Sequence, residues 1–195
     1  MNHADPVEAE SYRIMRSRLD LSALPPLSRA VTERVIYATA DFDYVTDLVC
    51  DEAALAAGVA ALRRGAPAVT DAVTVASGIG EYPVICKAAD SLATRLARTA
   101  NITVSAAAVR LAFSASGPGA VWLVGCAPGA LAEIMAREVE PALVIGVPVG
   151  FVGAVESKEA LIADSRGVPF IAVRGRVGGS AMTAAAVNGL ARAGL

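Results

Sequence analysis

Short runs of continuous apolar residues alternate with longer segments of helical periodicity over the carboxyl-terminal two thirds of the chain. Each run is apolar at nearly every position rather than at every second one, which is typical of strands buried on both faces of a sheet. The sequence therefore predicts a parallel sheet of about five strands, at residues 66–70, 83–86, 120–124, 142–147 and 169–173.

Segments with helical periodicity lie between most of these strands and also precede them. Pro6 suits the first turn of a helix to Leu19, and Pro26 or Leu27 opens a second helix that runs through Tyr37 towards Asp41. The strand–helix alternation predicts an α/β fold with helices on both faces of the sheet. No linker or repeat interrupts the chain, so we expect one domain over residues 1–195. The remaining helices are expected at residues 51–64, 91–98, 104–113, 128–138 and 180–191.

The stretch 111–132 carries no charged residue, so a membrane-spanning helix has to be considered. Glycine and proline at 117–119 and 128–129 divide it into a helix end, a buried strand and a new helix. The first ten residues are polar and acidic and lack the apolar region of a signal peptide. We therefore expect no membrane association and a cytoplasmic location.

Composition and charge exclude several classes of function. Of the 195 residues, 55% are hydrophobic and 18% charged, and the net charge of -2 predicts no broad basic face for nucleic acid. Three widely spaced cysteines fit free thiols in a reducing compartment rather than disulfides or a metal site. His3 is the only histidine, which argues against a serine or cysteine nucleophile paired with histidine and against a histidine-based metal site. We expect no metal.

Ligands of parallel sheets bind beyond the carboxyl ends of the strands, which here are followed by turns at 71–73, 125–129, 146–153 and 174–180. The last turn combines two arginines and three glycines with a helix start, a pattern that suits an anion but also tight packing. The turn at 146–153 leads to Glu156 and Lys158, which either begin a helix or reach back into the cleft. None of the turns has a nucleotide-binding fingerprint, so no nucleotide cofactor is expected.

Long motifs in these turns resemble the precorrin-8X methylmutase family. They are GVPVGFVGAVESK at 146–158, GVPF at 167–170 and RGRVGGSAMTAAAVN at 174–188. Weaker similarity covers residues 11–16, 38–41, 70–79, 105–107 and 125–131, so the resemblance spans essentially the whole chain.

The resemblance implies a flavodoxin-like three-layer αβα fold and a homodimer with sites near the interface. The implied reaction moves a methyl group between neighbouring ring carbons of a corrinoid macrocycle during cobalamin biosynthesis, without an added cofactor. The residues agree with this implication, because an apolar cleft edged with helix N-termini and a few arginines suits a flat, carboxylate-rich ligand.

The resemblance also implies site residues. Tyr37 occupies the position of the family's catalytic histidine and is the candidate proton donor, although it also fits an interface or core tyrosine. Ser11, Arg13 and Arg16 alternatively form a solvated helix face. Thr39 and Asp41 alternatively cap a loop, and Ser180 alternatively caps the last helix. The candidate substrate-binding residues are Ser11, Arg13, Arg16, Thr39, Asp41, Asp71, Val104, Ser105, Cys126, Gly129, Gly150, Glu156, Lys158, Arg174, Arg176, Gly178, Gly179 and Ser180.

This sequence departs from the family pattern at positions where the resemblance implies that the reaction takes place. Beside Tyr37, it has Val104 for an arginine, Cys126 for an asparagine, Gly129 for a threonine and Arg18 for an acidic residue. Three hypotheses remain open: a methylmutase that works with tyrosine, a repurposed enzyme acting on a more apolar polycyclic substrate by an isomerisation or pericyclic step, and a non-catalytic corrinoid-binding protein.

Overall fold

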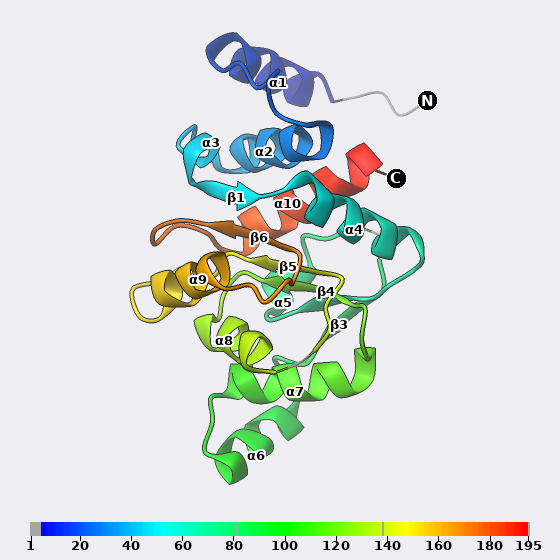
Figure 1. The fold of residues 1–195 in the computed structure, drawn as a ribbon, viewed down its shortest axis with the longest axis vertical. Helices are drawn as coiled ribbons and strands as arrows, with labels where there is room; N and C mark the ends of the chain where they lie inside the picture. Colours follow the sequence, from blue (N-terminus) through cyan, green and yellow to red (C-terminus); the bar gives the residue numbers. More distant parts are fainter. Residues whose placement is uncertain (1–4, 81, 138, 195) are drawn as a thin grey trace.

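Six strands form one mixed sheet in the computed structural model, which describes residues 5–80, 82–137 and 139–194 (Figure 1). The order across the sheet is β1-β6-β5-β4-β2-β3. The five predicted runs are confirmed as parallel strands, each slightly shorter than expected. They are β2 (Ala68–Thr70), β3 (Val84–Cys86), β4 (Val121–Val124), β5 (Leu143–Gly146) and β6 (Phe170–Val173).

The sheet has a sixth strand at one edge, and this strand is antiparallel, so the expected all-parallel sheet of about five strands is incorrect there. Strand β1 (Leu48–Cys50) pairs antiparallel with β6, in the register Leu48 to Val173. Its three residues are only half-buried and lie between Asp47 and Asp51. A run this short shows no periodicity, which is why the sequence pattern did not predict it.

The helices predicted from periodicity are confirmed, and three more are present. Of the two alternatives for Glu156 and Lys158, a helix start is present, because α9 (Ala154–Ala163) begins two residues before Glu156. The four-residue helices α3 (Tyr44–Asp47) and α5 (Val73–Ala76) were not predicted. The others are α1 (Pro6–Arg18), α2 (Pro26–Thr39), α4 (Glu52–Arg63), α6 (Ser91–Ala100), α7 (Val104–Ser116), α8 (Pro128–Ala136) and α10 (Ser180–Gly194).

Helices cover both faces of the sheet, as the sequence predicts. Helices α4 and α10 pack on one face and α7, α8 and α9 on the other (Figure 1). Leu123 and Ile145 belong to the core on the α10 side, whereas Trp122 and Val144 belong to the core on the other side. Helix α2 lies outside α10, α1 lies outside α2, and α6 lies outside α7.

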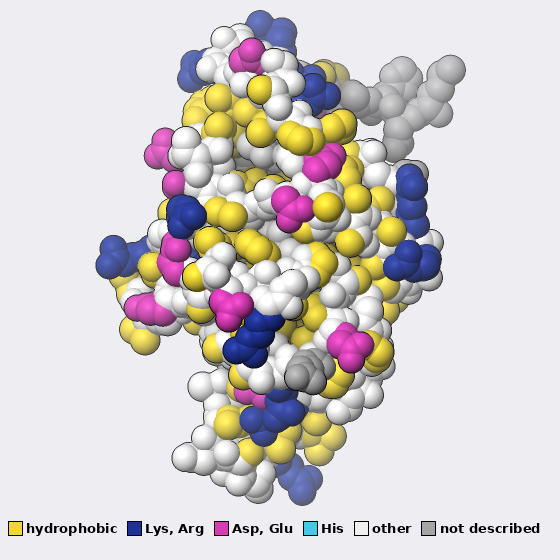
Figure 2. All heavy atoms as spheres, in the orientation of Figure 1, with side chains coloured by type: hydrophobic (Ala, Val, Ile, Leu, Met, Phe, Trp, Pro, Cys, Tyr) yellow, Lys and Arg dark blue, Asp and Glu magenta, His cyan; other side chains and the backbone are white. Residues whose placement is uncertain are grey.

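Basic and acidic side chains are interspersed on the face shown in Figure 2, with no large region of one sign. The uncharged stretch 111–132 forms the end of α7, strand β4 and the beginning of α8. Within the described ranges, no helix is long and apolar enough to cross a membrane. Cys50, Cys86 and Cys126 are free thiols.

Candidate functional site

The Asp71 carboxylate connects two turns at the carboxyl edge of the sheet by hydrogen bonds. Its carboxylate follows β2 and accepts hydrogen bonds from three successive amides after β4: Gly125 N at 3.0 Å, Cys126 N at 2.8 Å and Ala127 N at 2.6 Å. Burial raises the pKa of the Asp71 carboxyl, while the three amides act in the opposite direction. The carboxylate thus fixes the backbone of the turn that leads into α8.

A cluster of two hydroxyls and one thiol lies beside this turn. Ser180 Oγ, at the start of α10, is 2.8 Å from Thr74 Oγ1 and 2.9 Å from Cys126 Sγ. The contact between Thr74 Oγ1 and Cys126 Sγ is longer, at 3.7 Å. Cys126 and Thr74 are exposed, so the cluster can offer donors and acceptors to a polar ligand. Thr74 was not among the predicted site residues, although it lies in the segment 70–79 that resembles the family.

A second group of predicted residues meets where α7 faces α8. Ser105 Oγ is 3.0 Å from Thr103 Oγ1, which also accepts a hydrogen bond from Ala106 N and so caps α7. A Cβ atom at Gly129 would lie 3.0 Å from both hydroxyl oxygens, so glycine lets them approach α8 closely. Val104 is exposed at the start of α7. Thr103 was not among the predicted residues, although a threonine before a helix is a cap signal.

A hydrogen bond from Lys158 connects α9 to the turn after β6. Its side chain is fully buried, and Nζ donates a hydrogen bond to Val177 O at 2.6 Å. Burial lowers the pKa of Lys158 to about 8. Lys158 therefore reaches back towards the 174–180 turn, whereas Glu156 is exposed in the first turn of α9.

The turns after β5 and β6 also bond to each other through their backbones. Gly179 N donates to Val147 O at 2.9 Å, and Gly150 N donates to Arg176 O at 3.4 Å. Gly178 has a φ of 143°, and a Cβ atom there would lie 2.1 Å from Val147 O. A backbone oxygen cannot move aside as a flexible side chain can, so this position requires glycine.

We expect Gly178→Ala to lower the free energy of unfolding by about 3 kcal/mol, because it adds a backbone clash to a strained φ. Gly175→Ala is the matched control, since its φ is also positive at 75° but no atom lies within 4 Å of the added Cβ. The control should cost only about 1 kcal/mol. Urea unfolding of both variants checks this, and equal losses would contradict the clash.

The two arginines of the last turn lie at the surface. Arg174 Nη1 is 3.0 Å from Glu159 Oε2, and its backbone N donates to Asp47 O at 2.9 Å. Arg176 is exposed. Their guanidinium groups are therefore accessible to a ligand, and that of Arg174 already has an acidic partner.

Large apolar side chains are exposed at the same edge of the sheet. Phe151 and Val152, in the turn after β5, are 91% and 89% exposed. Soluble proteins seldom expose such side chains together unless they form a binding surface. The exposed apolar side chains at this edge, on its turns and at the first residues of α5 and α7, are Val73, Val104, Val149, Phe151, Val152 and Val177.

Tyr37 lies apart from these turns, in a stack between α1 and α2. Its ring is parallel to that of Tyr12, with centroids 5.2 Å apart. The Arg34 guanidinium lies 4.8 Å from the Tyr37 ring centroid, and the Arg16 guanidinium 5.3 Å from that of Tyr12. Two aromatic rings and two cations therefore attach α1 to α2.

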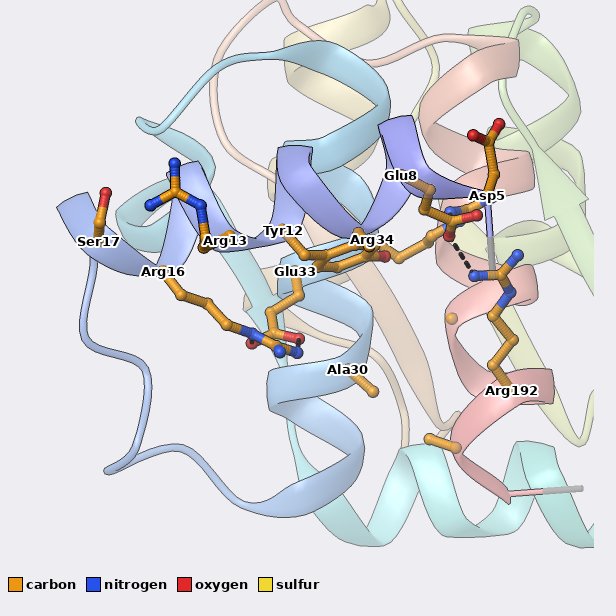
Figure 3. A pocket seen from close by; sticks show the side chains of 13 residues that line it. Asp5, Glu8, Tyr12, Arg13, Arg16, Ser17, Ala30, Glu33, Arg34 and Arg192 are labelled. Carbon is orange, nitrogen blue, oxygen red and sulfur yellow. Dashed lines mark hydrogen bonds and ion pairs between the residues drawn. The ribbon is translucent and has the colours of Figure 1, made fainter. Parts of the chain in front are cut away.

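A groove of about 1170 Å³ opens beside this stack, between α1, α2 and α10 (Figure 3). Arg13 and Arg16 line it, as does Glu8, which bonds both Arg34 and Arg192. Arg16 is paired with Glu33 of α2 through two hydrogen bonds of 2.9 and 2.6 Å. Most charges in the groove are therefore already paired within the protein.

The remaining predicted residues of α1 and α2 bond locally. Ser11 Oγ donates to Val7 O at 2.8 Å, and Arg13 pairs with Glu10 on the exposed face of α1. Thr39 Oγ1 donates to Val35 O and accepts from Asp41 N at 3.4 Å. These contacts match the alternatives of a solvated helix face and of loop capping.

The predicted residues thus divide into two places, the carboxyl edge of the sheet and the α1–α2 side. Within the described ranges, no three histidine, cysteine or acidic side chains gather as a metal site would require. His3 lies outside the described residues. The chemistry available at the edge is hydrogen bonding by hydroxyl, thiol, arginine and helix N-terminal groups next to apolar side chains.

Comparisons with known proteins point to one family. The model described as CbiC, precorrin-8X methylmutase, matches residues 6–193. A precorrin-8X methylmutase of Pseudomonas aeruginosa is 43% identical, over 93% of this chain and 92% of its own length. A cobalt-precorrin-8 methylmutase of Salmonella typhimurium is 38% identical, over 94% and 92%. The solved precorrin-8X methylmutase of Thermus thermophilus superposes with a TM-score of 0.85 at 33% identity, covering 98% of this chain and all of that one. The chain therefore belongs to the precorrin-8X methylmutase family, the isomerases of cobalamin biosynthesis.

Proposed function

We propose that this chain catalyses the methyl shift of a precorrin-8X-type corrinoid and that the macrocycle binds at the carboxyl edge of the sheet. The observation that carries this proposal is the convergence of the turns after β2, β4, β5 and β6 at that edge. Asp71 and Lys158 hold these turns, and exposed polar and apolar groups lie next to one another there. Such an edge suits a flat ligand whose ring is apolar and whose periphery carries carboxylates.

The groups at the edge have distinct proposed roles. The cluster of Thr74, Cys126 and Ser180 hydrogen-bonds a peripheral carboxylate of the macrocycle, next to the N-terminus of α10. Arg174 and Arg176 pair with other carboxylates. Phe151 and its apolar neighbours contact the face of the ring. No added cofactor enters this scheme.

The experiment that tests the proposal is an absorbance titration with hydrobyrinic acid, accompanied by an assay of precorrin-8X turnover. We expect binding and turnover. A Cys126→Val, Ser180→Ala double variant should weaken binding at least tenfold, because a carboxylate loses its charge-assisted hydrogen bonds. Absence of binding by the wild-type protein would contradict the proposal and favour a repurposed pocket.

Tyr37 is the proposed proton donor. Because it lies away from the sheet edge of its own subunit, this role requires a homodimer in which Tyr37 reaches the macrocycle bound at the partner's edge, and it predicts the behaviour of two variants. Histidine has an ordinary pKa near 6.5 and tyrosine near 10, so histidine donates a proton more readily. We expect Tyr37→His to raise kcat for precorrin-8X by about tenfold or more and Tyr37→Phe to abolish turnover. Tyr12→Phe, which keeps the neighbouring ring, should leave kcat unchanged. Full activity of Tyr37→Phe would exclude Tyr37 as the donor.

A second candidate function is corrinoid binding without turnover. It is favoured by the position of Tyr37, whose ring lies between Arg34 and Tyr12 rather than with the groups at the sheet edge. Under this alternative, hydrobyrinic acid binds but precorrin-8X is not converted, and Tyr37→His does not restore conversion.

Further properties belong to the same proposal. The parallel strands have the order β3-β2-β4-β5-β6, which is 2-1-3-4-5 when they are numbered from β2, and this order supports a flavodoxin-like fold. We further propose that the chain is one domain, that it acts in the cytoplasm and that it forms a homodimer. The exposed apolar side chains at the sheet edge support the dimer, since a partner subunit would cover part of them.

A further inference from the structure

Trp122 is the single tryptophan of the chain, and its side chain is buried in β4 with 1% exposed. Among the residues that the structure describes, none accepts a hydrogen bond from its indole Nε1–H. A buried donor without a partner is unfavourable, because it gives up the hydrogen bond to water that it makes in the unfolded chain. The indole therefore needs an acceptor from its immediate surroundings.

A small cavity adjoins this ring between β2, β4 and α7. The volume of this cavity that is accessible to the centre of a water molecule is about 10 Å³. That volume is close to the lower limit of roughly 10–15 Å³ for one water and is far too small for a metabolite. The lining residues are Val69, Thr70, Asp71, Ser105, Ala108, Val109, Ala112, Trp122 and Val124.

Two of the lining side chains can complete the hydrogen bonds of a water. The Asp71 carboxylate has about four acceptor positions, of which three bond the amides after β4. Ser105 Oγ is bonded to Thr103 Oγ1 but keeps a further acceptor position. Thr70 also lines the cavity, and its Oγ1, like Trp122 Nε1, has no hydrogen-bond partner among the described residues. Because Thr70 alternates with Asp71 along β2, its hydroxyl is expected on the opposite face of the sheet and is not assigned to the water.

We propose that one water molecule occupies this cavity, accepts a hydrogen bond from Trp122 Nε1–H and donates to Asp71 and Ser105. Three partners of this kind are what a buried water ordinarily has. The water joins the hydroxyls at the start of α7 to the carboxylate that holds the turn after β4. The inference does not depend on the proposed function, because it rests on an unpaired donor, a cavity and two acceptors.

The test uses the intact protein with ¹⁵N-labelled tryptophan, whose spectrum contains one indole N–H signal. We expect a cross-peak between that proton and a bound water, in the position typical of a hydrogen-bonded indole. Ala108→Val places a larger side chain at the cavity wall and should remove the cross-peak and move the signal upfield. Tryptophan fluorescence should shift to shorter wavelength in the same variant, because the excited indole loses its partner.

Ala115→Val is the matched control, because Ala115 is exposed on the same helix and the substitution is chemically identical. It should change neither the cross-peak nor the emission. A wild-type spectrum without the water cross-peak would overturn the inference on its own, whatever the variants do. Identical spectra of wild type and Ala108→Val would overturn it as well.

Discussion

Replacing Asp71 by asparagine should lower the free energy of unfolding by about 3 kcal/mol and abolish corrinoid binding. One carboxylate accepts three amide hydrogen bonds in the native protein. The amide group of asparagine would present a donor to at least one of those N–H groups, which would leave a buried donor unpaired. Urea unfolding and titration with hydrobyrinic acid measure the two effects.

The control for this substitution is Asp43→Asn, which makes the same chemical change at an exposed carboxylate. It should alter the free energy of unfolding by less than about 0.5 kcal/mol and leave binding intact. A loss below about 1 kcal/mol in Asp71→Asn would show that the turn after β4 does not depend on this carboxylate.

Lys158 should make the protein more stable at alkaline pH. Its pKa is about 8 in the folded protein against an ordinary value of 10.5, so between these two pH values the unfolded chain holds a proton that the folded chain has released. The free energy of unfolding therefore rises with pH across this window, by at most about 3 kcal/mol. Below pH 8 both states hold the proton and this dependence disappears.

Lys158→Met isolates the contribution, because methionine keeps much of the side-chain volume without the titrating group. Between pH 8 and 10.5, the free energy of unfolding of the wild type should rise relative to that of Lys158→Met. The other titrating groups are shared by both proteins, so their contributions cancel in the difference. Lys87→Met, which removes a partly exposed lysine paired with Asp90, is the control for the loss of a lysine as such. A pH-independent difference for Lys158→Met would mean that the buried ammonium titrates normally.

Much of the fold could be predicted because the parallel strands are buried on both faces and carry nearly continuous apolar runs. Val121–Val124 and Leu143–Gly146 have this character, and every residue in them is buried. Strand β1 could not be predicted, because an edge strand of three half-buried residues has neither periodicity nor a long apolar run. Its pairing with β6 is decided by tertiary packing rather than by local sequence.

The candidate site was predicted less completely than the fold. The turns were found because ligands of parallel sheets bind beyond the strand ends, and Cys126 and Ser180 do meet there. Thr74 was missed because it lies in a four-residue helix without a pattern of its own. The position of Tyr37 against Tyr12 could not be predicted either, since it depends on how α1 packs on α2.

The hydroxyl–thiol cluster joins Thr74 to Ser180, which are 106 residues apart in the sequence. Contacts of such long range close large loops, and the rest of the fold has to supply the conformational entropy that this closure costs. A ligand that requires this cluster binds the native state and not the unfolded chain, and it raises the melting temperature in proportion to the logarithm of its concentration. Thermal shift is therefore a way to search for ligands of this protein that needs no knowledge of the reaction.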